Sequence, residues 1–569
     1  MYTNLVNVQI IISLLKQHHI KKLILSPGNR DIPLVHSVET DSDFQCFSIV
    51  DERSAAYFAL GLAEASHEAV GFVCTSSTAS CNYTPAIEEA FRKHIPLIAL
   101  TADRENYYLY QFEDQKINQT DMYYPLTKYS ADLPVVRNEM DKWLCERKVN
   151  EALLAINDGI PGPVQINFQV DRTDVFLTQS LPVSRKITKF SKTMFEENID
   201  SLRKELIDKK IIVIVGENYY EPAQISTELE RFQTHYNAVV ITDHFSNVSG
   251  DFLNTARLIE TLTRDDFVHY MPDVVITIGG HIWSALKYLL RNSNSEFTHW
   301  RVSDDHVLRD GFKRLKYIFD VEPAVFLGSL CDSTVVENHY IELWKKKAAS
   351  IVLPDLKYTN FSIINQVMAK LPENSVVHCS ILNSARLNAF SQYSEKGIKT
   401  YCNFGCDGID GAMSSFLGQT YNHSSALSVL VIGDLSFLYD INASFEHFTP
   451  EKRVLLINNH AGSEFHTAFG LRRFPQLNLH IAAGHNNDLI EIIDTERFIY
   501  LSASCQDDLE KALPIFIGKS DKPIILEAFT DANQDGEVLN KFYSMNRVYS
   551  FKNKISTDLK QAIKRILKV

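Results

Sequence analysis

The sequence lacks the features that mark several large classes of protein. No run of 18 apolar residues appears along the 569-residue chain, so no membrane-spanning helix is expected. The first residues, MYTNLVNVQIIISLLKQHH, do not have the charged, apolar and small-residue regions of a signal peptide. Their pattern instead predicts an amphipathic helix that ends near His18. The sequence therefore predicts a cytoplasmic protein that does not bind a membrane.

Concentrated positive charge is also missing. The formal net charge is −13, and Glu205 and Asp208 interrupt the densest basic stretch, which spans residues 203–210. A surface for nucleic acid or for anionic lipid requires clustered Lys and Arg side chains. Neither partner is expected.

The nine cysteines form no CxxC pair. The two closest, Cys402 and Cys406, do not have the spacing of a zinc site, and reduced thiols in a cytoplasmic protein are the simplest interpretation. The turns VGE (215–217) and IGGH (278–281) also lack the GxGxxG pattern and the acidic ribose partner of a dinucleotide site. We therefore interpret these turns as structural.

What the sequence does contain is a nearly regular alternation of strand-like and helical segments, which is typical of parallel α/β sheets. Hydrophobic residues make up 45% and charged residues 22%, as in globular proteins, and the chain is too long for one core. A polar passage at residues 172–197 predicts a linker. We expect an α/β fold with three doubly wound parallel-sheet domains, at residues 1–180, 190–345 and 355–569.

The strands are expected where short runs are rich in β-branched and other apolar residues. In the first domain these runs are residues 22–26, 46–50, 69–74, 96–100 and 163–168, and in the second they are 211–216, 238–242, 273–280 and 299–303. In the third domain they are 375–379, 400–403, 427–433, 453–458, 498–502 and 523–528.

Two neighbouring runs in the third domain end in oxygen-bearing side chains. The run VLVI is followed by Gly433 and Asp434, and the run VLLI is followed by Asn458 and Asn459, 25 residues after Asp434. Adjacent parallel strands would bring these side chains together at the carboxyl edge of a sheet, where ligands bind. Carboxylate, amide and carbonyl oxygens suit Mg²⁺ or Ca²⁺ rather than zinc.

The segment after Asp434 adds a feature that suits a phosphate. The backbone N–H groups of Leu435 and Ser436 enter the next helix and can bind a phosphate group there. The pattern therefore favours a magnesium-bound diphosphate. Gly-Asp and Asn-Asn turns without a metal are also common in α/β proteins, and this alternative stays open on the residues alone.

The GD motif followed about 25 residues later by NN resembles the signature of enzymes that depend on thiamine diphosphate (ThDP). By this resemblance Asp434, Asn459 and the backbone carbonyl of Ala461 bind the metal, which is Mg²⁺ with Mn²⁺ or Ca²⁺ as alternatives. The family has glycine in most cases where this chain has Ala461, but alanine offers the same carbonyl.

ThDP chemistry also needs a carboxylic acid beside the pyrimidine N1′ atom. Burial raises the pKa of such an acid and keeps it protonated. The segment FSIVDERSAAYFALGLAEA offers Glu52 at a strand end, just before a helix with an alanine-rich face. A glutamate at the start of a helix can also have a purely structural role, because its negative charge interacts favourably with the helix dipole. Together with the metal motif, Glu52 becomes the expected cofactor-activating residue.

Further motifs narrow the resemblance. The stretches SPGNRDIPL, VDERSAAYFALGLA, CTSSTASCNYTPAIEEA, PLIALTADR, GCDGIDG and GDLSFLYDINA closely resemble the SEPHCHC synthase family of the menaquinone pathway, and the similarity spans essentially the whole chain. SEPHCHC is 2-succinyl-5-enolpyruvyl-6-hydroxy-3-cyclohexene-1-carboxylate. The resemblance implies the pyruvate decarboxylase-like architecture, with an N-terminal pyrimidine-binding domain, a central domain and a C-terminal diphosphate-binding domain.

The same resemblance assigns further roles. Ile409 would bend the cofactor, and the backbone of Asp407 and Gly408 would receive its 4′-amino group. Glu52 and Asp434 would come from different subunits, so a homodimer or a dimer of dimers is expected. The substrates, a 2-oxo acid donor and an acceptor, would lie near Asn29, Arg30, Arg104, Gln115, Arg386, Phe404, Glu464 and Phe465.

Four places depart from the family pattern. Phe404 replaces an arginine, Ala285-Leu286 replace a Lys-Arg pair, Leu382 replaces a serine, and Glu464 replaces an apolar residue. Three positive charges are lost, and each buried charge-assisted contact is worth about 1.5–3 kcal/mol. Isochorismate, the acceptor of the family, would then bind several orders of magnitude more weakly.

The sequence therefore predicts a ThDP-dependent 2-oxo acid decarboxylase and carboligase with an acceptor less anionic than isochorismate. His460, Glu464 and His466 are candidates for proton transfer, with a solvated loop as the alternative for the histidines. A SEPHCHC synthase with a divergent pocket is the nearest alternative function. A non-catalytic ThDP-binding or regulatory protein is a further alternative, which the presence of Glu52 disfavours.

Overall fold

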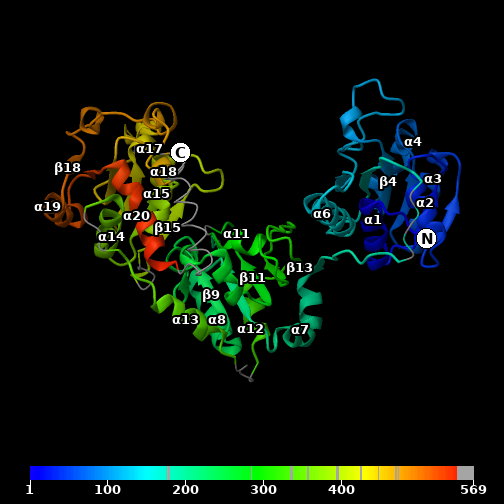
Figure 1. The fold of residues 1–569 in the computed structure, drawn as a ribbon, viewed down its shortest axis with the longest axis horizontal. Helices are drawn as coiled ribbons and strands as arrows, with labels where there is room; N and C mark the ends of the chain where they lie inside the picture. The colour runs from blue at the N-terminus through cyan, green and yellow to red at the C-terminus, as the bar shows by residue number, and fades with distance from the viewer. Residues whose placement is uncertain are drawn as a thin grey trace, which may run out of the picture. The chain divides into compact units, whose positions relative to one another are not determined.

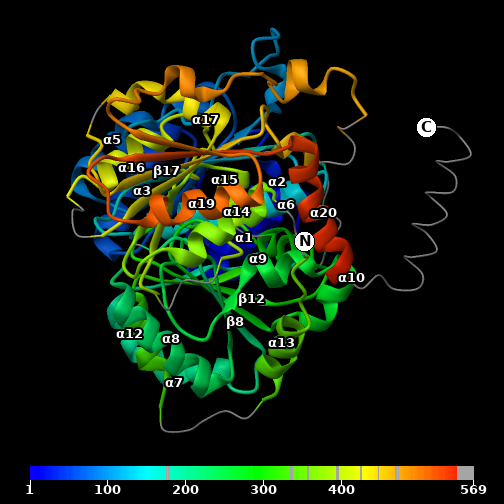
Figure 2. The same ribbon diagram turned by 90° about the vertical axis from the view of Figure 1, so that its left-hand side faces the viewer.

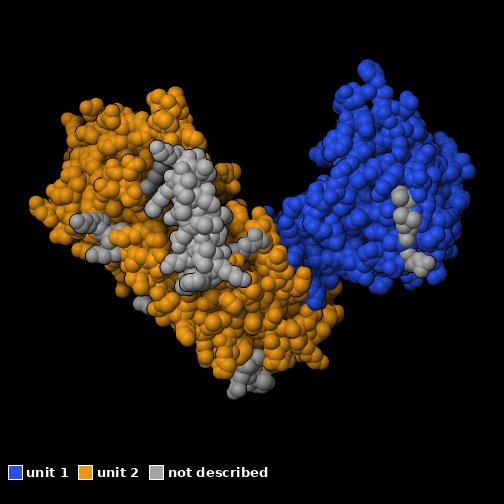
Figure 3. All heavy atoms as spheres, in the orientation of Figure 1, with its two compact units in different colours: residues 1–189, 307–318 blue, residues 190–306, 319–569 orange. Residues whose placement is uncertain are grey.

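The computed structural model describes residues 1–547, except residues 175, 177, 179, 219, 283–284, 333–337, 355–357, 392–395, 423–425, 446, 468–470 and 472 (Figure 1). The chain divides into two compact units, residues 1–189 with 307–318 and residues 190–306 with 319–569 (Figure 3). In the described part of the chain, no helix is long and apolar enough to cross a membrane.

The first unit contains a six-stranded parallel sheet with the strand order β2-β1-β3-β4-β6-β5. Its strands are β1 (Lys22–Leu25), β2 (Gln45–Ser48), β3 (Val70–Cys74), β4 (Leu97–Asp103), β5 (Ser130–Leu133) and β6 (Val164–Gln169). Its helices are α1 (Val6–Gln17), α2 (Ile32–Glu39), α3 (Glu52–Ser66), α4 (Thr78–Cys81), α5 (Thr84–Lys93), η1 (Asn106–Tyr108) and α6 (Glu139–Ala155).

Both faces of this sheet are covered. Leu23 and Leu25 of β1 pack with the buried residues of α1 and α6, whereas Ile24 between them packs with those of α3 and α5. Alternate strand residues point to opposite faces, so a strand that is apolar throughout needs helices on both sides. The predicted doubly wound α/β arrangement is confirmed.

The central sheet has seven strands in the order β10-β9-β8-β11-β12-β13-β7. They are β7 (Thr188–Phe190), β8 (Ile211–Val215), β9 (Val239–Thr242), β10 (Leu253–Asn254), β11 (Val274–Ile278), β12 (Thr298–Val302) and β13 (Leu315–Phe319). The helices are α7 (Lys192–Leu206), α8 (Pro222–Tyr236), α9 (Thr255–Leu258), η2 (Ile259–Thr261), α10 (Arg264–Phe267), η3 (Val268–Tyr270), α11 (Leu286–Arg291), α12 (Pro323–Leu330) and α13 (Tyr340–Ala349). Helices α7, α8 and α12 pack together (Figure 2).

The linker predicted at residues 172–197 is wrong in its second half. Strand β7 and the start of α7 lie within it. Ser191 caps α7, because its side chain accepts a hydrogen bond from the Met194 N–H at 3.3 Å. A serine at this place is a helix-start signal, which the polar composition of the segment obscures.

The C-terminal sheet repeats the strand order of the N-terminal one, as β15-β14-β16-β17-β19-β18. Its strands are β14 (Val376–Cys379), β15 (Lys399–Cys402), β16 (Ser428–Gly433), β17 (Lys452–Asn458), β18 (Ile499–Ala503) and β19 (Ile524–Phe529). Its helices are α14 (Asn360–Lys370), α15 (Asn383–Asn388), α16 (Ala412–Gln419), α17 (Asp434–Tyr439), η5 (Ile441–Phe445), α18 (Glu464–Thr467), η6 (Leu477–Ile481), η7 (Leu489–Ile492), α19 (Gln506–Ile517) and α20 (Ala532–Asn546).

The strands of this sheet also bury alternate residues on opposite faces. Val429 and Val431 of β16 lie in the core with α14, α15, α19 and α20, whereas Leu430 and Ile432 lie in the core with α16 and α17. Helix α20, red in Figure 1, packs beside α14. The sheet is therefore doubly wound, and its strands all end at one carboxyl edge.

Candidate functional site

Strands β16 and β17 bring the predicted metal ligands together. The two strands pair in parallel with Gly433 opposite Ile457. The Asn459 N–H donates to Asp434 Oδ2 at 3.1 Å, and the Leu435 N–H donates to Asp434 Oδ1 at 2.7 Å. Asp434 is only 3% exposed. The expected meeting of the two strand ends is confirmed.

A cavity of about 440 Å³ opens beside these residues. Asn459 and Ala461 line one part of it, and Thr530 and Asp531 line another. The amide oxygen of Asn459, the carbonyl of Ala461 and the neighbouring Asp434 carboxylate are hard oxygen donors. Phosphate and water usually complete the coordination shell of a Mg²⁺ ion that only a few protein groups bind. The donor set and the space therefore fit a metal-bound diphosphate.

His485 is a residue of this site that sequence reasoning missed. Its Nε2 lies 3.3 Å from Asp434 Oδ2, and its backbone N–H donates to the His460 carbonyl at 2.9 Å. The neighbouring Asp434 carboxylate raises the pKa of His485. No local pattern in the sequence connects His485 with residue 434, because a loop outside the strands brings it there.

The GCDGIDG loop after β15 contacts the same edge. Ser436 Oγ donates to the Ile409 carbonyl at 2.5 Å, which joins this loop to α17. Asp407 has a φ of 54°, a left-handed conformation that few residues other than glycine adopt readily. Ile409 is half-buried against the C-terminal core, and Asp407 and Gly408 precede it.

Glu52 is the first residue of α3 in the first unit. Asp51 caps this helix, because its side chain accepts from the Ser54 N–H at 2.9 Å. Glu52 is half-buried, and its Oε2 accepts a hydrogen bond from Asn82 Nδ2 at 3.3 Å. Since Asp51 already caps the N-terminus of this helix, Glu52 is not required for capping.

Asp31 is a second carboxyl group at this edge, and sequence reasoning missed it. It is fully buried, and among the described residues neither of its oxygens has a hydrogen-bond partner. Burial raises its pKa to about 7, and the charge of Glu52 acts in the same direction. A Cβ atom at Gly28 would lie 2.7 Å from Asp31 Oδ1 and 2.3 Å from Thr75 Cβ, so the backbone passes close to this group.

Two arginines of the first unit, Arg30 and Arg104, interact with one carboxylate, that of Glu113. Arg104 Nη1 donates to Glu113 Oε1 at 2.6 Å. Burial and the charge of Arg104 lower the pKa of Arg30, whereas Glu113 acts in the opposite direction. Asn29 and Gln115 are exposed. Glu113 is thus an internal counter-charge that the sequence analysis did not identify.

Arg386 has its own counter-charge in the second unit. Arg386 Nη1 lies 2.5 Å from Glu464 Oε2, in a pair that is partly exposed. Burial lowers the pKa of Arg386, but Glu464 outweighs it and the net shift is upward. Phe465, the next residue, is 37% exposed.

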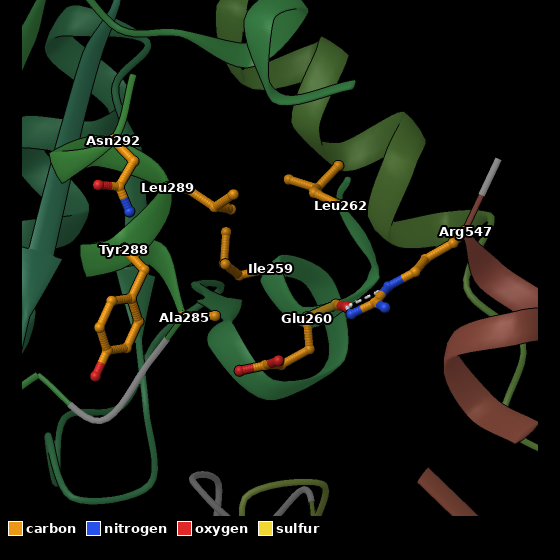
Figure 4. Close-up of a pocket in the computed structure, with 8 residues that line it drawn as sticks. All are labelled: Ile259, Glu260, Leu262, Ala285, Tyr288, Leu289, Asn292 and Arg547. Carbon is orange, nitrogen blue, oxygen red and sulfur yellow. Dashed lines mark hydrogen bonds between the residues drawn. The ribbon is translucent and has the colours of Figure 1, made fainter. Parts of the chain in front are cut away.

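Phe404 lies in an aromatic cluster. Its ring centroid is 4.9 Å from that of Phe245 and 5.5 Å from that of His281, and Phe404 is only 6% exposed. Leu286 is fully buried. Ala285 lines a second cavity of about 240 Å³, whose walls include Ile259, Leu262 and Leu289 (Figure 4).

The two candidate histidines have different surroundings. His466 is buried between Asn533 Oδ1 and Asn478 Oδ1, each 2.9 Å from a ring nitrogen, so a solvated loop is the wrong interpretation for it. His460 is half-buried and lines the larger cavity.

Comparison with known proteins identifies this arrangement. Residues 7–122 match the family model described as thiamine pyrophosphate enzyme, N-terminal TPP binding domain. The 2-succinyl-5-enolpyruvyl-6-hydroxy-3-cyclohexene-1-carboxylate synthase of Phocaeicola vulgatus is 31% identical over 95% of this chain and 99% of its own. The enzyme of the same name from Bacteroides thetaiotaomicron is 32% identical, and that from Flavobacterium johnsoniae 29%, with the same coverage.

These matches define an enzyme that depends on ThDP and a divalent metal ion and transfers aldehyde residues. Within that class, the chain belongs to the SEPHCHC synthase family.

Proposed function

We propose that this enzyme releases CO₂ from a 2-oxo acid and joins the remaining fragment to an acceptor that is less anionic than isochorismate. The observation that carries the proposal is the aromatic cluster around Phe404. An arginine at position 404 would place a buried charge among aromatic rings. Phe404 carries no charge, so a substrate meets no cation at this position.

Each part of the site would have its own task in this reaction. Asp434, Asn459 and the Ala461 carbonyl would hold the metal, and the N–H groups at the start of α17 would bind the diphosphate. Bound ThDP supplies the carbanion that makes the loss of CO₂ from a 2-oxo acid possible. Glu52 would hold the proton at the pyrimidine N1′ atom, where a neutral carboxyl group is needed.

The absence of cationic side chains at positions 285, 286 and 404 supports an acceptor that differs from isochorismate. Phe404 is buried, Leu286 is fully buried, and Ala285 lies against a cavity whose walls are mainly apolar but include Glu260 and Arg547. A charge-assisted hydrogen bond contributes about 1.5–3 kcal/mol, and each 1.4 kcal/mol is a factor of ten in affinity. An acceptor with several carboxylates would therefore bind much more weakly than in a site with three additional cations.

SEPHCHC synthase activity itself is the second candidate. The name of the relatives and their identity of 31–32% over 95% of the chain favour it. Arg30, Arg104 and Arg386 are also present for anionic substrates. In this alternative the donor is 2-oxoglutarate, the acceptor is isochorismate, and the product belongs to menaquinone biosynthesis.

One assay separates the two candidates. Recombinant enzyme with Mg²⁺ and ThDP is given 2-oxoglutarate, with and without isochorismate, and CO₂ and the coupled product are measured, the latter by mass. CO₂ release without a coupled product supports our proposal. A coupled product formed at a rate matching CO₂ release supports SEPHCHC synthase. If no 2-oxo acid among a panel releases CO₂, both candidates fail.

We also propose a homodimer, or a dimer of dimers, in which Glu52 and Asp434 of different subunits meet at one cofactor. Glu52→Gln and Asp434→Asn each inactivate every site of a homo-oligomer. In mixed oligomers, some sites combine the intact residue 52 of one subunit with the intact residue 434 of the other. Mixing the two variants after mild dissociation should therefore restore about a quarter of the wild-type activity in a random dimer mixture. Full inactivity of mixed oligomers would contradict the shared site.

A further inference from the structure

One ion pair connects two short helices at the carboxyl edge of the C-terminal sheet. Arg386 lies in α15, which comes after β14, and Glu464 begins α18, three residues after Ala461. Arg386 Nη1 and Glu464 Oε2 are 2.5 Å apart, and the two side chains are 30% and 25% exposed. Ligands of doubly wound sheets bind at this edge, so the pair lies where a substrate can reach it.

Glu464 is held in place from a second side. With the amide of Asn383 oriented so that both its atoms are satisfied, its nitrogen donates to Glu464 Oε2 at 2.9 Å. Its oxygen then accepts from the Glu464 N–H at 3.2 Å and from Ser463 Oγ at 2.8 Å. The carboxylate is therefore directed at Arg386 before any ligand arrives, as in preorganised charge-assisted pairs.

The carboxyl group of Glu260 also interacts electrostatically with Arg386. Arg547 donates from Nε and Nη2 to the backbone carbonyl of Glu260, at 3.2 and 2.9 Å. The Glu260 carboxylate points away from the Arg547 guanidinium (Figure 4). Burial raises the pKa of Glu260, and the charge of Arg386 opposes this shift more than any other group does. The directly paired Glu464 carboxylate thus reduces the attraction of Arg386 for a further anion, and any negative charge on Glu260 acts in the same direction.

We propose that Glu464 is a specificity-determining residue, which competes with a substrate carboxylate for Arg386. A donor with a second carboxylate must displace Glu464 and then lies beside its negative charge. A 2-oxo acid with a short uncharged side chain meets neither obstacle. Glu464 thereby lowers the preference for dicarboxylic over monocarboxylic 2-oxo acids. The inference deepens the proposed function, because it concerns the donor of that same reaction.

The first test measures binding, without turnover. Wild-type enzyme and Glu464→Gln, both loaded with Mg²⁺ and ThDP, are titrated calorimetrically with glutarate, an unreactive dicarboxylate, and with butanoate, a monocarboxylate of similar length. The substitution should strengthen glutarate binding about tenfold or more, since a charge-assisted contact to Arg386 becomes available. Butanoate binding should change less than twofold. Unchanged or weaker glutarate binding would overturn the inference.

Two further variants provide the controls. Glu491→Gln makes the same chemical change at an exposed position of η7, and it should bind both acids as the wild type does. Glu464→Asp keeps the negative charge, and its glutarate affinity should stay within about threefold of the wild type. Melting curves of all variants establish that they are folded, and a Glu464→Asp effect as large as that of Glu464→Gln would contradict the role of charge.

The second test uses the reaction. Glu464→Gln should raise the ratio of kcat/KM for 2-oxoglutarate to kcat/KM for pyruvate about tenfold or more, and an unchanged ratio would overturn the inference. If no 2-oxo acid is decarboxylated, the proposed function fails, but the glutarate titration still decides the role of Glu464.

Discussion

The N-terminal and C-terminal sheets share one strand order but carry different side chains after their strands. When the strands of each sheet are numbered along the chain, their spatial order in both sheets is second, first, third, fourth, sixth and fifth. The second strand is followed by Glu52 in one sheet and by the loop with Ile409 in the other. The third strand of the C-terminal sheet is followed by Asp434. The same scaffold therefore offers an acid at one edge and the proposed metal and diphosphate site at the other.

The arginines at the two edges behave alike. Arg104 comes after the fourth strand of its sheet and pairs with Glu113, and Arg386 comes after the first strand of the other sheet and pairs with Glu464. Asp434, in contrast, has His485 at 3.3 Å and a cavity beside its neighbour Asn459. Asp434 is thus buried beside a cavity that can hold a ligand, whereas Arg104 and Arg386 are already paired within the chain.

The strongest way to break this comparison is to change Asp434. Asp434→Asn keeps the shape but removes the charge that attracts the metal, and we expect ThDP affinity in the presence of Mg²⁺ to fall at least about a hundredfold. Calorimetric titration with ThDP at fixed Mg²⁺ measures this change. Asp507→Asn, at an exposed position of α19, is the control. An affinity within threefold of the wild type would show that the metal is bound elsewhere.

The N-terminal edge is tested at Glu52. Glu52→Gln should reduce the rate of CO₂ release about 10²- to 10⁴-fold, the usual contribution of a positioned acid or base. ThDP affinity should change only a few-fold, because the metal and diphosphate groups remain. Glu64→Gln, further along α3 on its exposed side, should retain full activity. A large loss of ThDP affinity in Glu52→Gln would assign this residue to binding instead.

Substitution of Phe404 tests whether the residues around it form a packed core. Phe404→Ala should lower the free energy of unfolding by about 3–5 kcal/mol, since the side chain is buried against Phe245 and His281. Urea-induced unfolding measures this, with the half-exposed Phe474→Ala as the control. A loss below about 1 kcal/mol would mean that the space around Phe404 is open to a ligand.

The smallest effect is expected at Asp31 and depends on pH. Because the folded-state pKa of Asp31 is raised to about 7 from 3.8, its stabilising contribution is complete below pH 3.8 and is lost as pH rises through 7. Between pH 5 and pH 8 the wild type should lose about 2–3 kcal/mol of stability that Asp31→Asn retains. Urea unfolding at several pH values measures the difference. Parallel pH profiles for the two proteins would contradict this assignment.

Sequence patterns predict the strands that end at both edges. The runs at residues 427–433 and 453–458 agree with β16 and β17 to within one residue, and Asp434 and Asn459 come directly after them. The strands β5 and β13 are missed, because Ser130–Leu133 and Leu315–Phe319 contain polar residues that break the apolar pattern. Such strands are stabilised by their neighbours in the sheet rather than by their own composition.

The pairings of charged groups could not be predicted in the same way. Glu464 stands out in the sequence, but its contact with Arg386, 78 residues away, depends on how two short helices lie beside each other in the fold. Asp31 belongs to a motif that the sequence makes visible, yet its burial without a partner is a tertiary property. His485 reaches Asp434 from a loop without apolar periodicity, so no local signal connects them.

The contacts of His466 have a consequence for how such an enzyme can change over generations. The imidazole is fixed by Asn478 and Asn533, and it anchors the short helix that carries Glu464. The short helix therefore has an anchor that does not depend on the side chain of residue 464. Since glutamate and glutamine codons differ by a single base, one nucleotide is enough to alter which acids a descendant of this protein accepts.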